Sequence, residues 1–118
     1  MSEDNWPIYF YQTSSKKEPI KEFLDSLPAK DLAKARKRMK LLKEFGPFEL
    51  GIPYIKQIED KLWELRISGD SEYRILWFIF AGDSIVLLHG FVKKTDSIPR
   101  RHIETAYKRM ELFLEKWG

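Results

Sequence analysis

Residues 61–94 constrain the fold most, because they hold three consecutive strand patterns joined by short turns. β-Branched and aromatic residues dominate each pattern, and the turns between them read SGDSE and AGD. Such runs between turns rich in Gly, Asp and Ser are typical of an antiparallel meander. We therefore predict three antiparallel strands, at Leu62–Ile67, Tyr73–Phe80 and Ser84–Lys94.

The segments before the meander predict a short strand and two helices. Trp6–Gln12 is rich in aromatic residues, and Pro7 near its start favours the edge of a sheet. A first helix is expected to begin at Pro19, and a second runs from Lys30 to a stop at Gly46-Pro47. Both show apolar residues at helical spacing, which are Ile20, Phe23, Leu24 and Leu27 in the first, and Leu32, Ala35, Met39 and Leu42 in the second.

The remaining segments complete an α+β fold. Phe48–Tyr54 is expected to be an irregular connector, and Ile55–Glu59 an early, bulged entry into the first meander strand. A last helix opens at Pro99. The predicted order is β-α-α-β-β-β-α, a mostly antiparallel sheet covered by a helical hairpin, with a C-terminal helix. At 118 residues, we expect residues 1–118 to form a single domain.

Composition favours a folded, cytoplasmic protein. Hydrophobic residues make up 43% of the chain, and there is no cysteine to form a disulfide framework or a thiolate metal site. No targeting signal is visible in the acidic start MSEDNWPIYF, and no apolar run approaches the length of a membrane helix. We expect no membrane association.

Positive charge gathers on two segments although the net charge is only +3. Residues 30–44 hold seven Lys or Arg against two acids, and residues 93–109 hold six against two. Clustered positive charge suits a polyanionic partner, and solvated helix faces explain it equally well.

A cationic set is embedded in the meander: Arg66, Arg74, Lys93 and Lys94. If the first hairpin pairs at its connection, the two arginines lie near each other. Like charges on one face repel without a counter-anion, and guanidinium groups suit bidentate phosphate contacts. Alternatively, the arginines are structural, with Arg74 paired to Glu64 or Glu72.

The other potentially functional residues also have structural interpretations. His89 is more simply a packed, hydrogen-bonded histidine than a general acid or base, and His102 is expected at the surface. Tyr54 and Phe91 are able to stack on nucleic-acid bases, although most aromatic residues are core residues. No metal-binding spacing occurs, so we predict no metal site and no cofactor.

Four motifs carry a resemblance to a known family. The runs LWELR, YRIL and LLHGFVKKT, followed by PRRHIETA, resemble the RelE/ParE toxin superfamily, and most closely its phage-derived, HigB-like branch. With the β-α-α start, the resemblance covers roughly residues 6–115. It implies a toxin of a type II toxin–antitoxin system, neutralised by an antitoxin with a helix-turn-helix domain and contacting DNA only through that complex.

The resemblance also implies an activity. Several members cut mRNA on the ribosome by attack of the ribose 2′-OH on the adjacent phosphate, without a metal. Arg74 would then stabilise the transition state and Arg66 would hold phosphate. Lys94 would stand near the leaving oxygen, assisted by Lys93, and Glu64 would be a base or orienting group. Lys56 is a further candidate for the base or orienting role. The residues that we predict to bind RNA are Lys56, Tyr54, Phe91, Arg100 and Arg101. The His/Tyr pair that some relatives use as general acid at the end of the last strand is missing from this pattern.

Two further functions stay open at the level of sequence. One is a ParE-like toxin that poisons DNA gyrase and cleaves no RNA, since the same fold carries both activities. The other is a degenerate toxin that serves only with its antitoxin as a DNA-binding repressor complex.

Overall fold

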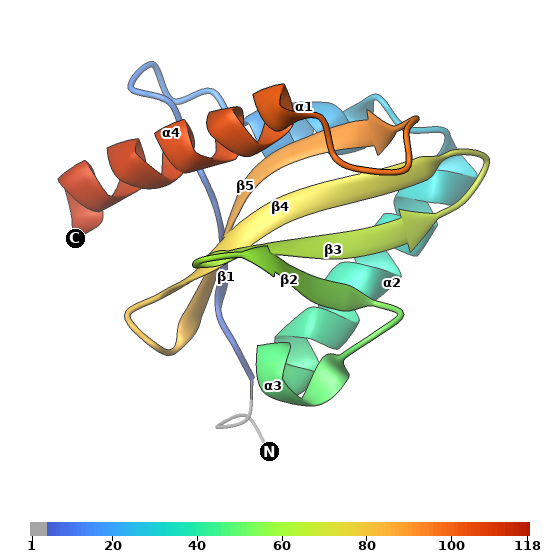
Figure 1. The fold of residues 1–118 in the computed structure, drawn as a ribbon, viewed down its shortest axis with the longest axis horizontal. Helices are drawn as coiled ribbons and strands as arrows, with labels where there is room; N and C mark the ends of the chain where they lie inside the picture. Colours follow the sequence, from blue (N-terminus) through green and yellow to red (C-terminus); the bar gives the residue numbers. More distant parts are fainter. Residues whose placement is uncertain (1–4) are drawn as a thin grey trace.

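A five-stranded mixed sheet with four helices makes up the part of the chain that the computed structural model describes, residues 5–118 (Figure 1). Residues 1–4, which belong to the acidic start, lie outside the described residues. The strands are β1 (Ile8–Phe10), β2 (Ile55–Glu59), β3 (Leu62–Ser68), β4 (Glu72–Phe80) and β5 (Ser84–Lys93). The helices are α1 (Pro19–Asp25), α2 (Ala29–Phe45), α3 (Pro47–Leu50) and α4 (Arg100–Trp117).

The meander is confirmed as the centre of the sheet. The strand order is β1-β5-β4-β3-β2, in which β3, β4 and β5 pair antiparallel in sequence order. The short strand β1 pairs parallel with β5 and forms an edge, as Pro7 predicted. Within residues 5–118, no helix combines the length and apolarity needed to span a bilayer.

Two expectations about the middle of the chain are wrong. Ile55–Glu59 is not an early entry into β3 but a separate strand, β2, which folds back through a turn at Asp60-Lys61. Lys61 has a φ of 62°, which allows this tight reversal. The segment 48–54 is not wholly irregular, because Pro47 starts one helical turn, α3, directly after Gly46. The predicted order therefore lacked one strand and one short helix.

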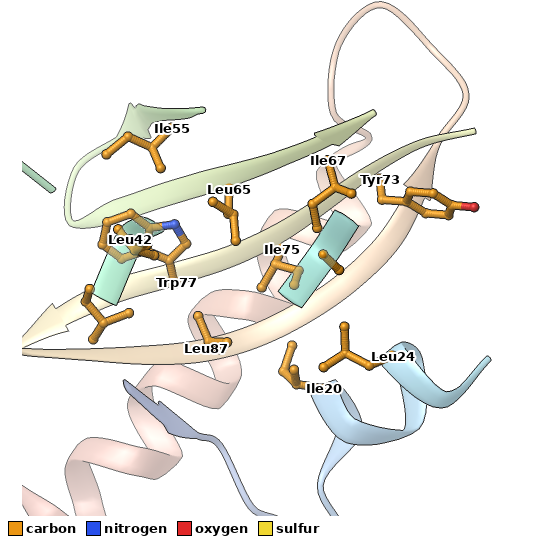
Figure 2. Packing of buried hydrophobic residues seen from close by; sticks show 12 residues of the cluster. Ile20, Leu24, Leu42, Ile55, Leu65, Ile67, Tyr73, Ile75, Trp77 and Leu87 are labelled. Carbon is orange, nitrogen blue, oxygen red and sulfur yellow. The ribbon is translucent and has the colours of Figure 1, made fainter. Parts of the chain in front are cut away.

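The sheet is covered on both faces. Helices α1 and α2 pack on one face, as the predicted hairpin, and α4 crosses the other (Figure 1). Figure 2 shows the first core, where Leu42 of α2 and Ile20 of α1 lie over strand residues that include Leu65, Ile67, Ile75, Trp77 and Leu87. The second core joins α4 to Leu62, Leu76, Phe78, Val86 and Leu88. Because β4 and β5 carry apolar residues on both faces, the alternation of polar and apolar residues in the sequence could not show which face meets which helices.

A β-bulge in β5 reassigns faces near the end of that strand. Leu76 pairs with His89 but Trp77 pairs with Leu87, so Leu88 is left without a partner in the register. Strict alternation would place Leu88 and Phe91 on opposite faces, yet both belong to the core against α4. The bulge therefore turns His89 and Phe91 towards α4, on the side where Arg74 lies.

We expect core truncations on either face to be equally damaging. Leu65→Ala, on the α2 side, and Leu76→Ala, on the α4 side, each remove a side chain with 0% exposure. Each should lower the free energy of unfolding by about 2–5 kcal/mol, because a cavity remains where the side chain was. Leu114→Ala, at a position that is 40% exposed, is the control and should cost far less. Urea denaturation measures all three, and a mild effect of Leu76→Ala would contradict a second core.

Candidate functional site

Arg66 and Arg74 lie directly opposite each other on neighbouring strands. The register pairs Arg66 of β3 with Arg74 of β4, and Phe91 of β5 continues the same row. Arg74 alternates in phase with Leu76 and Phe78, which pack beneath α4, so the arginine pair faces the α4 side of the sheet. The expected proximity of the two arginines is confirmed.

Two carboxylates balance the two guanidinium groups. Glu64 Oε2 lies 2.7 Å from Arg66 Nε, and Glu64 Oε1 lies 3.4 Å from Arg74 Nε. Arg74 Nη1 also lies 3.1 Å from Glu72 Oε1. Like-charge repulsion therefore gives no argument for a bound anion here, since the protein supplies its own counter-charges. The expectation that Glu64 and Glu72 pair with the arginines is confirmed.

The exposures of these groups differ in a way that matters for a ligand. The Arg74 and Glu64 side chains are only 9% and 4% exposed, whereas that of Arg66 is 30% exposed. A ligand that arrives from solvent meets Arg66 first. Burial raises the pKa of the Glu72 carboxyl, but hydrogen bonds from Ser68 and Arg74 outweigh it, and the net pKa is lowered.

The two lysines at the end of β5 do not form one free set with the arginines. Lys93 Nζ donates to the carbonyl oxygens of Thr95 and Asp96, at 2.8 and 2.9 Å, and so shapes the loop that leads into α4. Lys94 lies just beyond β5 and is exposed. Lys93 is a loop-holding residue in this arrangement, and Lys94 is the lysine that remains accessible.

The predicted RNA-binding residues fall into two groups. Lys56 is exposed on β2 and stands opposite Glu64 in the register, so it lies on the same side of the sheet as the arginine pair. Arg100 and Arg101 are exposed in the first turn of α4, where Arg100 forms an ion pair with Glu59 at 3.0 Å. These three cations border the α4 side of the sheet.

The two aromatic residues are placed differently. Tyr54 packs with the core on the α2 side and carries the Arg38 guanidinium 4.5 Å from its ring centre, so it lies away from the arginine pair. Phe91 is 6% exposed and is stacked on the His102 ring, with centroids 3.9 Å apart. Neither ring is open to a nucleic-acid base beside Arg66.

The structure adds a histidine pair that the sequence did not indicate. His102 was expected at the surface, and the structure shows it only partly buried: it stacks on Phe91, and its Nδ1 lies 2.8 Å from His89 Nε2. His89 is packed and hydrogen-bonded, as expected. A signal did exist, because His102 stands one helical turn before Ala106 and so borders the buried stripe of α4.

Asp31 is a second residue that the sequence left unnoticed. It lies in the first turn of α2 with 0% exposure and accepts hydrogen bonds from the Tyr73 hydroxyl and the Asp70 backbone N–H. The hydrogen bond from Tyr73 lowers the pKa of the Asp31 carboxyl. A Cβ added at Gly69 would collide with the Asp31 carboxylate, so any larger residue there would have to displace that side chain. Asp31 thus fixes the β3–β4 connection that joins the two arginine strands.

Comparison with known families places the chain. Residues 22–111 match the family described as "Phage derived protein Gp49-like (DUF891)", and this match spans most of the 118 residues. The chain belongs to this family. At family level, this Gp49-like membership agrees with the toxin-type protein that the sequence motifs resemble. No curated protein matches the chain. Among residues 5–118, no three or more His, Cys, Asp or Glu side chains gather as metal ligands.

Removing Glu64 should destabilise the protein through its partners. Glu64→Ala leaves buried Arg74 with Glu72 alone and is expected to cost about 2–4 kcal/mol of unfolding free energy, because an undercompensated charge stays buried. Glu59→Ala, which breaks the exposed pair with Arg100, is the control and should cost less than about 1 kcal/mol. Chemical denaturation at pH 7 measures both, and equal effects would show that the Glu64 cluster is not structurally important.

The Asp31 clamp predicts a specific response to acid. Because its folded-state pKa is lowered, Asp31 contributes stability above its usual pKa near 3.8, and that stability is lost as the pH falls through the folded-state value. We expect Asp31→Asn to lower the melting temperature at pH 7 and to flatten its decline below about pH 4. The control is Asp25→Asn, which alters an exposed pair with Lys21. Thermal melts at pH 2–7 measure how the melting temperature depends on pH. Parallel curves for wild type and Asp31→Asn would contradict a stabilising role of the Asp31 carboxylate.

Proposed function

We propose that this Gp49-like protein is the toxin of a type II toxin–antitoxin system, of the HigB-like branch, and that it cuts mRNA on the ribosome. In this proposal the 2′-OH of one nucleotide attacks the adjacent phosphate, which leaves a cyclic phosphate and a free 5′-OH. Family membership and the arginine pair on the α4 side of the sheet support the proposal.

The observation that carries the proposal is the Arg66–Glu64–Arg74 arrangement. Arg66 is half-buried at the rim, and its guanidinium is held at Nε by Glu64, which leaves its terminal nitrogens to meet a phosphate. Arg74 lies behind it as a second, buried cation that favours the negative charge of the transition state. Glu64 accepts from one guanidinium and lies against the other, so an orienting role fits it better than the role of a base.

Exposed cations on other surfaces suit ribosomal RNA. Lys56, Lys94 and Arg101 are exposed around the arginine side of the sheet. The basic helix α2 covers the opposite face, with exposed Arg36, Lys37, Lys40 and Lys43. Contacts of both surfaces with phosphates would make ribosome binding strongly salt-dependent. The proposed neutralising partner is a cognate antitoxin with a helix-turn-helix domain, and the proposed site of action is the cytoplasm.

Expression of the protein in a bacterium, with primer extension on a reporter mRNA, tests the proposal. Wild type should give codon-phased cuts, and Arg66→Gln should reduce them on the order of a hundredfold, because one phosphate contact is lost. Lys116→Gln removes an exposed charge at the far end of α4, outside both cationic surfaces, and is the control that should keep cutting. Circular dichroism melts of the purified variants separate loss of activity from loss of fold. Growth arrest with intact mRNA would contradict the proposal.

One observation favours a second candidate. The pairing of both arginines with Glu64 and Glu72 is also what a purely structural arginine pair would show. A ParE-like toxin that poisons DNA gyrase needs no phosphate-cleaving group. Accumulated gyrase–DNA cleavage complexes without mRNA cuts in the same cells would support this alternative.

A further inference from the structure

The histidine pair belongs to a hydrogen-bonded row of three side chains that begins at Arg109. Arg109 Nη1 donates to the Leu88 carbonyl oxygen at 2.8 Å and lies 3.2 Å from His89 Nδ1. An arginine nitrogen is a donor only, so His89 Nδ1 must be the acceptor and carries no proton. The proton of neutral His89 therefore sits on Nε2.

The tautomer of His89 determines that of His102, because the two rings share a hydrogen bond. His89 Nε2 donates to His102 Nδ1 at 2.8 Å, so the proton of neutral His102 sits on Nε2. Among residues 5–118, His102 Nε2 has no hydrogen-bond partner. The hydrogen-bonded row therefore leaves the Nε2–H group of His102 as a donor without an acceptor among residues 5–118.

Burial and the neighbouring positive charges favour the neutral form of both histidines. Burial, followed by the charges of Arg109 and His102, lowers the pKa of His89 to about 4. Burial and then Arg101 lower the pKa of His102. From β4, the register partner of His89 is uncharged Leu76, and Tyr11 lies by the Arg109 guanidinium, 5.8 Å from its ring centre. The positive charge of Arg109 at His89 Nδ1 also disfavours a metal cation there.

The location of His102 links this N–H group to the arginine pair. His102 stands in the first turn of α4 and stacks on Phe91, with ring planes 8° apart. Phe91 is the register partner of Arg74, which in turn pairs with Arg66. The histidine therefore lies beside Phe91 at the end of the arginine row, directly after the exposed Arg101 in the sequence.

We propose that His102 donates its Nε2–H, as a neutral imidazole, to a phosphate oxygen of the RNA bound at Arg66, and that Arg109 holds this tautomer through His89. This inference rests on the proposed function. A neutral donor at a developing negative charge stabilises it without a protonation step. His102 would contact substrate, while His89 and Arg109 are positioning residues.

Nitrogen-15 NMR of the histidine side chains tests the tautomer without any activity. Both rings should show the Nε2–H form at pH 7 to 8, and both should protonate only below the pH near 6.5 at which an ordinary histidine titrates. Arg109→Leu should let His89 titrate or change tautomer, while Lys108→Leu, at an exposed neighbouring position, should not. A His102 ring that carries its proton on Nδ1, or is charged at pH 7, would overturn the proposal.

Cleavage assays with purified ribosomes test the role. His102→Phe keeps an aromatic ring over Phe91 but lacks the N–H, and should lower the cleavage rate on the order of a hundredfold. The shape of the pH–rate profile should stay unchanged, and His102→Gln, which retains an N–H donor, should recover part of the rate. Wild-type activity in His102→Phe would overturn the role of His102 while leaving the proposed function intact.

A direct measurement of RNA contact distinguishes failure of the proposed nuclease function from failure of the proposed role of His102. A 2′-O-methyl RNA trinucleotide, which cannot be cleaved, should shift the His102 Nε2 resonance in wild type and should bind more weakly to Arg66→Gln. If wild type cuts no mRNA but this shift is seen, the nuclease proposal fails and RNA contact by His102 stands. If the trinucleotide binds without shifting that resonance, the contact is refuted.

Discussion

The central strands of this sheet are covered on both faces, and this constraint governs the buried charges within them. Helices α1 and α2 exclude water from one side and α4 from the other, so a charge placed in β3 or β4 needs a partner inside the protein. Glu64 meets that need for Arg74 and Arg66 together. Buried polar groups elsewhere are likewise hydrogen-bonded inside the protein: neutral His89 contacts Arg109 and His102, and Asp31 accepts from Tyr73.

These paired groups divide into two kinds by position. Asp31 sits on the α2 side and holds the β3–β4 connection, which sets the register that brings Arg66 opposite Arg74. The arginine pair and the histidine pair sit on the α4 side, where Arg66 is 30% exposed and both histidines are partly buried. One face thus stabilises the hairpin and the other presents donors at its rim. This division suits the proposed recognition of a phosphate by preorganised side chains.

Much of the fold was predictable from sequence, because the meander, the edge strand and the helix stops have strong local signals. The second strand and α3 were not, since β2 forms only through pairing with β3 and α3 is a single turn. The β5 bulge leaves no local signal either, and it decides which way His89 and Phe91 point.

The part of the site that lies within one hairpin was also predictable from the sequence. Arg66, Arg74 and Glu64 share one hairpin, so strand register alone brings them together. The engagement of Lys93 with its own loop and the stacking of Phe91 on His102 depend on where α4 returns over the sheet. Tyr54 shows the limit clearly, because only the tertiary fold reveals that it faces α2.

The most direct measurement of the central claim is the chemistry of the RNA ends. Purified protein is added to ribosomes programmed with a defined mRNA, and the products are identified by mass spectrometry. The account predicts fragments with a 2′,3′-cyclic phosphate and a 5′-OH, formed only when the ribosome is present. Intact mRNA on programmed ribosomes, or fragments with a 3′-OH and a 5′-phosphate, would contradict it.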